Sequence, residues 1–320
     1  MEDEIKFCSN ILDKVSRSFA LTIPMLDDKL YKPVMITYLQ DRLLDNFEDE
    51  IDEIDLGKRK YLMNRVVSIF DSDNSHPQAD IEVIKNHACH IKGASLRKLT
   101  ENVDIVYKAF SNLNKTTKSL SYKWMKEMNK GMKKYLNKEI RSFSNLDEYC
   151  YYVAGTVGGL LTELIITKSN ISSEKEEKLL ANYKDAGLFL QKVNIIRDIK
   201  QDIDNREKNF WPLEELKITE KELSDPVNKD RALKCLDNMI SNVEANIEGL
   251  VEYMDNLPVC FPGYRKFFLV NNALGLATLQ KMKNNSRVLY GEKEVKVAKI
   301  KFLRILMKPE KCFYKYSRDV

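Results

Sequence analysis

The chain has 320 residues, of which 43% are hydrophobic, so it can bury a large core as one large domain or as two tightly joined ones. Its 52 basic and 48 acidic side chains leave a formal charge of +4, which is too small to favour a protein built around a nucleic-acid backbone. The six cysteines are far apart and form no CxxC pair, so neither a zinc knuckle nor a disulfide framework is indicated, and a reducing cytosol fits best.

Apolar residues recur at helical spacing along most of the chain, and alternating strand patterns are nearly absent, so the sequence predicts an all-α protein. The breaks are rich in Pro, Gly, Asn, Asp or Ser and fall at 71–80, 111–118, 169–174, 205–216, 223–230 and 256–264. None is a clear interdomain linker, and we expect one body over 1–292 and a basic tail over 293–320. The acidic start lacks the apolar core of a signal peptide, and no run of about 18 uncharged apolar residues predicts a membrane span.

The first polar cluster lies near the start, in "KVSRSFALTIPML", where Ser16, Arg17 and Ser18 precede an apolar run that begins at Phe19. Arginine suits the bidentate capture of phosphate oxygens. Ser and Arg are also common at the start of a helix, so a capping role is the alternative.

The next helix, "YLQDRLLDNFEDEIDEID", carries an acidic cluster. Asp45, Glu48 and Asp49 stand at i, i+3 and i+4, so they share one helical face, and Arg42 lies three residues before Asp45. Like charges at this spacing repel by a few tenths of a kcal/mol per pair, and by more away from water, unless cations neutralise them. A solvated acidic face is the alternative, but the apolar residues around the cluster count against it.

The segment "YCYYVAGTVGGLLTELI", 149–165, has a strip of small residues: Ala154, Gly155, Gly158 and Gly159. Each Gly lowers helix stability by about 1 kcal/mol relative to Ala, so something must come close to this surface. Two interpretations of this strip remain open: tight packing against another helix, and space for a long hydrocarbon. Tyr149 and Tyr152 at the same end offer phenol groups that could face carbocations or diphosphate.

The helix "LFLQKVNIIRDIKQD", 188–202, carries a second polar stripe, made of Gln191, Asn194, Asp198 and Gln201 or Asp202. Carboxylate and amide oxygens without His or Cys suit Mg²⁺ rather than zinc. Two such helices facing each other would form a cage for Mg²⁺ ions that hold a diphosphate, with Arg197 binding phosphate oxygens or orienting the acids. For Asn194 alone, an ordinary surface amide is the alternative.

The tail, "VKVAKIKFLRILMKPEKCFYKYSRDV", is basic. From Lys293 onward it has nine Lys and Arg against three Asp and Glu. Its apolar residues alternate with these cations, so we expect it to rest on an anionic membrane surface. The alternative is a basic final helix packed on the body and followed by a frayed end.

Several of these elements together resemble the squalene and phytoene synthases, the head-to-head prenyl-diphosphate condensing enzymes, and most closely squalene synthase. They are "SRSFA", "YLQDRLLDNFEDE", "MNKGMKKYL", "YCYYVAGTVGG", "LFLQKVNIIRDIKQD" and "NFWP". The resemblance implies a single-domain isoprenoid synthase fold, a helical bundle around a deep central cavity, with the catalytic domain over 1–292. It also implies Mg²⁺-dependent joining of two farnesyl diphosphates to presqualene diphosphate, followed by reduction with NADPH to squalene.

The resemblance assigns roles to individual residues. The implied Mg²⁺ ligands are Asp45, Glu48, Asp49, Asp198 and Asp202. The implied substrate-binding residues are Ser16, Arg17, Ser18, Phe19, Gln191 and Asn194. The implied catalytic residues are Tyr38, Arg42 and Tyr149, of which Tyr149 handles the proton of the first half-reaction. The implied cofactor-binding residues are Arg197, Arg206 and Lys208.

Four positions depart from the family pattern, namely Asn10, Gln201, Asn271 and Asn272, and the loop "IDNREKNFWP" is about one residue longer than usual. The alternative reading is therefore an enzyme that stops at presqualene diphosphate or makes dehydrosqualene or phytoene without hydride. A non-catalytic isoprenoid-binding protein is a third reading, against which two costly acidic clusters argue. We expect a cytoplasmic protein in peripheral contact with the inner face of a membrane.

Overall fold

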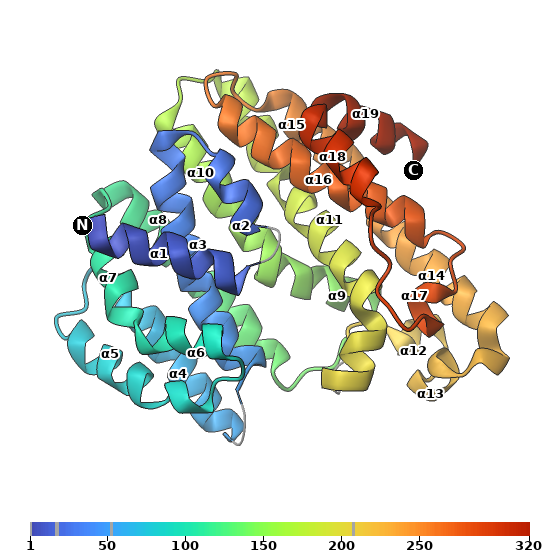
Figure 1. Cartoon of the computed structure of the whole chain (residues 1–320), viewed down its shortest axis with the longest axis horizontal. Coiled ribbons are helices and arrows are strands. Elements are labelled where there is room, and N and C mark those ends of the chain that lie inside the picture. Colours follow the sequence, from blue (N-terminus) through green and yellow to red (C-terminus); the bar gives the residue numbers. More distant parts are fainter. Residues whose placement is uncertain (1, 17–18, 52–53, 207–208) are drawn as a thin grey trace. The chain divides into compact units, whose positions relative to one another are not determined.

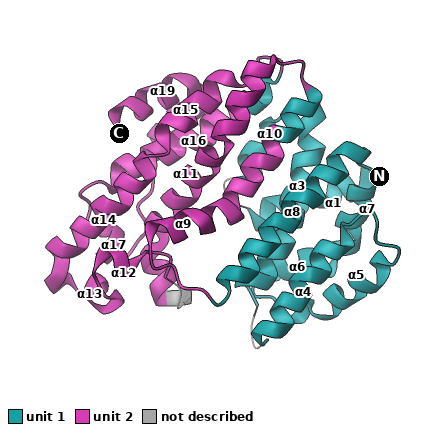
Figure 2. Ribbon diagram, turned by 180° about the vertical axis from the view of Figure 1, so that it is seen from behind, with its two compact units in different colours: residues 1–137, 163–168, 261–264 teal, residues 138–162, 169–260, 265–320 magenta. Residues whose placement is uncertain are grey.

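The computed structural model of the protein describes residues 2–16, 19–51, 54–206 and 209–320, without the side chains of 205 and 206. Across these ranges the secondary structure is helical, and the β pairing is confined to an isolated bridge between Ile51 and Ile91. The all-α prediction is confirmed. Contacts within the chain divide it into two compact units, which Figure 2 colours separately.

Unit 1 consists of residues 1–137, 163–168 and 261–264. Its helices are α1 (Glu2–Val15), α2 (Phe19–Thr22), η1 (Ile23–Met25), α3 (Asp28–Asp49), α4 (Leu56–Ile69), α5 (Pro77–Asn86), η2 (Ala88–His90), α6 (Ala94–Glu101), α7 (Val103–Ser111) and α8 (Lys115–Tyr135).

Helix α3 is the core element of unit 1 and contacts α1, α4, α7 and α8 (Figure 1). Leu39, Leu43 and Phe47 on it are fully buried. Several of its buried polar atoms find partners, because the Gln40 Oε1 atom accepts a hydrogen bond of 2.5 Å from the Ser121 hydroxyl of α8 and the Asn46 side-chain NH₂ donates to the Thr100 hydroxyl at 3.1 Å. The helix that carries the first acidic cluster is therefore held by packing over most of its length.

The start of helix α16 (Pro262–Met282) is capped by a residue far away in the sequence. The carboxylate of Asp27 accepts hydrogen bonds from the backbone N–H groups of Gly263, at 3.2 Å, and Tyr264, at 2.9 Å. A Cβ atom on Gly263 would lie 2.5 Å from the carbonyl oxygen of Met25, so only glycine fits this contact. Residues 261–264 are held in unit 1 in this way.

Unit 2 consists of residues 138–162, 169–260 and 265–320. Its helices are α9 (Phe143–Cys150), the π-helical turn η3 (Tyr151–Gly155), α10 (Thr156–Lys168), α11 (Ser173–Arg206), α12 (Leu213–Leu216), α13 (Glu220–Ser224), η4 (Pro226–Asn228), α14 (Lys229–Glu244), α15 (Ile247–Asn256), α16, α17 (Arg287–Tyr290), α18 (Lys299–Met307) and α19 (Pro309–Asp319). Helix α10 ends within unit 1, and α16 begins there.

Helix α11 runs through the middle of unit 2 beside α15 and α16 (Figure 1). Helix α11 and η3 approach each other closely at Gly187. A Cβ atom added to this glycine would lie only 2.6 Å from the Ala154 carbonyl oxygen. A Cβ atom on Gly158 would likewise lie 2.6 Å from the Tyr183 carbonyl oxygen. At Gly155 and Gly158 the small-residue strip therefore serves tight helix packing.

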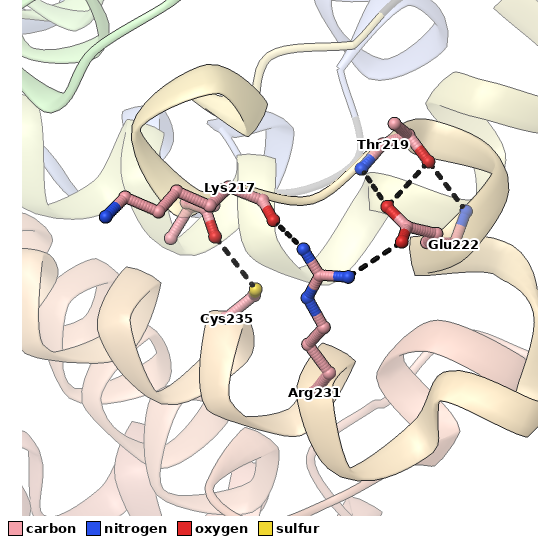
Figure 3. A network of polar contacts seen from close by, with 6 residues as sticks. Lys217, Thr219, Glu222, Arg231 and Cys235 are labelled. Atoms are coloured by element: carbon pink, nitrogen blue, oxygen red, sulfur yellow. Dashed lines mark hydrogen bonds and ion pairs between the residues drawn. The ribbon is translucent and has the colours of Figure 1, made fainter.

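The segment that follows "NFWP" is fastened to α14 by a polar network (Figure 3). Thr219 and Glu222 form a capping box at the start of α13. Arg231 of α14 binds the Glu222 carboxylate at 2.7 Å and also donates to the Lys217 carbonyl oxygen. Lys217 itself adopts the left-handed conformation, with φ of 55°, at the end of α12.

The basic tail is folded. Helices α18 and α19 belong to unit 2, and Phe313 of α19 is fully buried with its ring 6.2 Å from that of Phe268. The alternative of a basic final helix packed on the body is confirmed for α19, apart from its frayed end, since the helix continues to Asp319. A separate body over 1–292 with a tail over 293–320 stays a prediction.

One helical run is long and apolar enough to cross a membrane by length and composition. It is Phe143–Lys168, and 56% of its most apolar window is buried inside the structure. Buried helices of protein cores pass the same test, so this run on its own is weak evidence for a membrane span.

Candidate active site

The first acidic cluster forms at the C-terminal end of α3. One carboxylate oxygen from each of Asp45, Glu48 and Asp49 lies within 4.8 Å of the others. Glu48 is only 4% exposed, so the mutual repulsion of these carboxylates is poorly screened by water. Three oxygen donors this close together fit a hard divalent cation such as Mg²⁺. The predicted grouping of the three acids is thus observed.

A cation stands beside the cluster, as predicted for Arg42. One Nη atom of Arg42 binds the Asp45 carboxylate, and the other lies 3.7 Å from Glu50. Burial lowers the pKa of this guanidinium, but the charges of Asp45 and its neighbours more than offset that and raise the pKa. The buried Nε atom of Arg42 has no hydrogen-bond partner among the residues that the structure describes. A buried free N–H group fits an additional anionic ligand, such as a phosphate oxygen.

Asp41 was missed by the sequence analysis, although it lies one helical turn before Asp45. Burial, and secondarily the charge of Asp45, raises the pKa of the Asp41 carboxyl to about 8. Around neutral pH this group therefore holds a proton for much of the time when no cation is bound. The acidic face of α3 is one carboxyl longer than predicted.

Ser16, Phe19 and Tyr38 come together near Arg42. The Ser16 Oγ atom accepts a hydrogen bond of 3.1 Å from the Phe19 N–H group, so the capping alternative is observed for this serine. The Phe19 and Tyr38 rings lie 5.6 Å apart. Burial raises the pKa of the Tyr38 hydroxyl, against the effect of its hydrogen bond with Ser16. Arg17 and Ser18 lie outside the described residues.

Arg59 of α4 holds the end of α3 in place, which the sequence analysis did not foresee. Its guanidinium donates to the carbonyl oxygens of Glu48 at 3.4 Å, Ile51 at 3.1 Å and Ile54 at 3.2 Å. These carbonyls lie at and just beyond the helix end, where the helix itself offers them no donors. Arg59 therefore fixes the backbone that carries the acidic cluster.

The second acidic pair lies on α11 in unit 2. Both oxygens of Asp198 accept hydrogen bonds from the guanidinium of the next residue, Arg197, at 2.7 and 2.6 Å. Burial lowers the pKa of Arg197, but the hydrogen bonds and the charge of Asp198 raise it overall. Asp202, one turn later, is only 4% exposed. A metal at this pair would therefore share Asp198 with Arg197. That the two acidic clusters face each other stays a prediction.

The other residues of the α11 stripe differ in exposure. Gln191 is half-buried, whereas Asn194 and Gln201 are exposed, so the surface-amide alternative fits Asn194 in this structure. The side chain of Arg206 and all of Lys208 lie outside the described residues.

Lys192, on another face of α11 than the polar stripe, is a fully buried residue that the sequence analysis did not single out. Its ammonium forms an ion pair of 2.7 Å with Asp147 of α9 and a hydrogen bond of 2.8 Å with Asn246. A buried ammonium needs such partners. Since Asp147 is two residues before Tyr149, this ion pair fixes α9 and with it the predicted catalytic tyrosine.

Tyr149 is buried, and its ring stacks on Phe210 of the "NFWP" motif, with centroids 5.0 Å apart and planes at 23°. The next residue, Trp211, donates its indole N–H to the Ile195 carbonyl of α11 at 3.4 Å. The π-helical turn η3 directly follows α9, and such turns are frequent at functional sites. The tyrosine is thus held between an aromatic ring and an irregular helical turn.

A cleft of about 660 Å³ opens in unit 2 beside Arg197. Its cationic lining residues are Arg197, Lys200, Lys281, Arg287, Lys293 and Lys296. Acidic residues on its wall, among them Asp204 and Glu294, only partly offset this charge. The cleft can accommodate an anionic group that carries an apolar or aromatic portion.

Comparison with known proteins identifies the family. The squalene/phytoene synthase family model matches residues 12–301. The chain belongs to the squalene/phytoene synthase family. Among solved structures, that of TcSQS with the ligand BPH1237 superimposes with a TM-score of 0.85 at 27% identity, covering 99% of this chain and 90% of that one. The predicted isoprenoid synthase fold is therefore confirmed.

Two relatives from Arabidopsis thaliana bear on activity within the family. Squalene synthase 1 is 31% identical over 297 residues, which cover 89% of this chain and 67% of the relative. Inactive squalene synthase 2 is also 31% identical, over 91% of this chain and 68% of the relative. The chain spans about two thirds of the length of these relatives. Because both match equally well, activity has to be argued from residues and not from overall identity.

Proposed function

We propose that this chain is a squalene synthase. It joins two farnesyl diphosphates head to head to presqualene diphosphate in a Mg²⁺-dependent reaction, then reduces this intermediate with NADPH to squalene. The observation that carries the proposal is the ligand set of Asp45, Glu48 and Asp49 with Arg42 beside it. A protein that only holds isoprenoids has no need of such repulsive carboxylates on a largely buried helix.

The donor chemistry fits Mg²⁺ at both acidic clusters. Asp45, Glu48 and Asp49 would hold it in unit 1, and Asp198 and Asp202 would hold it in unit 2. When bound, Mg²⁺ neutralises the charge that develops on the diphosphate leaving group. Of the chain's own groups, Arg42 donates its Nε–H to a phosphate oxygen. The guanidinium of Arg197, whose Nε and one Nη atom bind Asp198, adds positive charge beside the second acidic pair.

The aromatic residues serve the organic part of the substrate. Tyr38 and Phe19 present rings near Arg42, where they shield an allylic cation from water. The hydroxyl of Tyr149 handles the proton released in the first half-reaction, held in place by the Phe210 stack and by the Lys192–Asp147 ion pair. A buried phenol can relay this proton, because its oxygen accepts the incoming proton while its own O–H proton passes to an oxygen of the released diphosphate.

The cleft beside Arg197 supports NADPH as the second cofactor. Its lysines and arginines fit the phosphates of a dinucleotide, and its volume allows part of the cofactor to be enclosed. NADPH, when bound, supplies the hydride for the second half-reaction. Arg206 and Lys208, on the predicted cofactor loop, are proposed to contribute as well.

A product formed without hydride is the second candidate. Asn271 and Asn272 stand at two of the positions that depart from the family pattern, and both are buried and donate to backbone carbonyls one turn earlier. Within the described part of the chain, the Oδ1 atom of Asn272 remains buried without a hydrogen-bond partner. These amides place polar atoms in the buried part of α16, and this departure from the family pattern favours dehydrosqualene, phytoene or presqualene diphosphate as the alternative product.

Incubation of the purified protein with farnesyl diphosphate and Mg²⁺, with and without NADPH, tests the proposal. Squalene formed only with NADPH is expected. Presqualene diphosphate or dehydrosqualene in both reactions would replace the proposal by the second candidate. No turnover, together with retained binding of farnesyl diphosphate, would place the chain with its inactive relative. Asp237→Asn, an exposed change on α14, is the control for substitutions at the acidic clusters.

We also propose a cytoplasmic location in peripheral contact with the inner face of a membrane. The proposed product is a hydrocarbon, which partitions into lipid and not into water. Fractionation of cells that produce the full chain tests the location, and a protein found entirely away from membranes would exclude the contact.

A further inference from the structure

Helix α18 presents an exposed apolar strip. Ile300, Leu303 and Met307 are 83%, 55% and 74% exposed. They stand at i, i+3 and i+7, so they share one face of the helix. Single exposed apolar side chains are common on protein surfaces. Three of them along one face of a nine-residue helix form a contiguous patch.

Positive charge borders this strip on both sides. At 100° per residue, Lys299 lies on one flank, and Arg304 and Lys308 lie on the other. All three side chains are exposed. The helix therefore has an apolar centre line with a cationic edge on each side.

The opposite face of α18 is fixed to unit 2. Ile305 is fully buried. The Lys301 ammonium donates to Gln280 Oε1 of α16 at 3.1 Å and lies 4.3 Å from the centre of the Tyr316 ring. In Figure 1, α18 and α19 lie beside α16 at the red end of the chain. The strip is thus carried by a packed helix, and not by a loose tail.

We propose that this face of α18 docks on a lipid bilayer that contains anionic headgroups. The three apolar side chains enter the boundary between headgroups and acyl chains, and Lys299, Arg304 and Lys308 reach the phosphates around them. A second copy of the chain fits the strip poorly, because a symmetric contact would bring the same cations together. The inference deepens the proposed location and does not depend on the catalytic assignment.

Co-sedimentation of the full-length protein with vesicles, without substrate, tests this proposal. One vesicle set is phosphatidylcholine alone, and the other contains about one third phosphatidylglycerol, an anionic lipid. The apolar variant combines Ile300→Ser, Leu303→Ser and Met307→Ser. The matched control combines Val227→Ser and Val259→Ser, which remove two exposed valines from loops and short turns elsewhere in unit 2.

The wild type and the valine control are expected to pellet with anionic vesicles and to be released by high salt. The apolar variant is expected to bind at least about 10-fold more weakly, with unchanged circular dichroism and melting temperature. A charge variant, with Lys299→Gln, Arg304→Gln and Lys308→Gln, is expected to lose the preference for anionic lipid.

Three results would overturn the inference. The first is equal pelleting of the wild type and the apolar variant. The second is equal binding of the wild type to both vesicle sets. The third is a dimer of the wild type in the absence of lipid that the apolar variant fails to form, which would assign the strip to a contact between copies. Squalene formation is measured separately in detergent, so a failure of the docking proposal is distinguishable from a failure of the proposed activity.

Discussion

Replacement of Asp41 by Asn should change how the stability of unit 1 depends on pH. Partial burial, and secondarily the charge of Asp45, raises the pKa of the half-buried Asp41 carboxyl from 3.8 to about 8. Between these values the native protein retains a proton that the unfolded chain releases, so stability falls as pH rises. This group therefore contributes most below about pH 4, and its contribution is lost as pH approaches about 8.

The magnitude follows from the shift. Within this window, each pH unit lowers the free energy of unfolding by about 1.4 kcal/mol. A rise from about pH 5 to about pH 7 therefore lowers it by at most about 2.7 kcal/mol. Asp41 is partly exposed, and water screens part of this effect, so we expect about 1–2 kcal/mol. Asp41→Asn has nearly the same shape and carries no titratable proton, so the variant should lose this part of the pH dependence.

Urea unfolding followed by tryptophan fluorescence measures the effect in unit 1. The chain has two tryptophans, Trp124 in unit 1 and Trp211 in unit 2, so Trp211→Phe in every protein leaves the unit 1 reporter alone. The buffers contain EDTA, because a bound cation would itself stabilise the ionised carboxylates. Asp13→Asn, an exposed change on α1, is the control. A stability difference between wild type and Asp41→Asn that stays the same at about pH 5 and about pH 7 would refute the reasoning.

Three further changes have defined outcomes. Asp45→Asn and Asp198→Asn should each lower the rate of farnesyl diphosphate consumption by about 10²-fold or more, whereas Asp237→Asn should not, and near-normal turnover would remove that acid from the metal site. Gly187→Ala should destabilise unit 2 by about 1–3 kcal/mol in urea unfolding, because the added Cβ atom would lie 2.6 Å from a carbonyl oxygen. Helix propensity alone predicts instead a gain in stability of about 1 kcal/mol, and that result would contradict the tight packing at this position. Tyr149→Phe should keep the aromatic stack and the melting temperature but slow formation of presqualene diphosphate, and an unchanged rate would exclude the hydroxyl from the proton transfer.

The sequence was most informative where the geometry is local. The spacing of Asp45, Glu48 and Asp49 already places three carboxylates on one face, because helical periodicity alone decides which side chains are neighbours. The same holds for Arg42, three residues away from its partner. The all-α fold was predictable for a similar reason, since strand patterns are nearly absent along the chain.

Features made by contacts between distant residues were not predictable. The spacing that groups Asp45 with its neighbours also includes Asp41, but only the packing around α3 determines that its carboxyl is removed from water. The cationic cleft joins Lys200 to Lys281 and Lys296, which are about 80 residues or more away in the sequence. The sequence shows how many basic residues the tail has. Only the fold shows that some of them line the cleft and others lie on the surface of α18.

The three hydrogen bonds from Arg59 to backbone carbonyl oxygens affect which metal ion the first acidic cluster binds. They tie down the end of α3, so the backbone that carries the carboxylates of the first cluster has little freedom to shift. Ca²⁺ gathers six to eight oxygens at about 2.3–2.6 Å, whereas Mg²⁺ takes six at about 2.1 Å and keeps several of its waters. Three carboxylate oxygens on a fixed stretch of backbone leave the rest of a six-oxygen shell to water and phosphate, which suits Mg²⁺. The selectivity of the site for magnesium over calcium would then originate in a side chain that touches neither the ion nor the substrate.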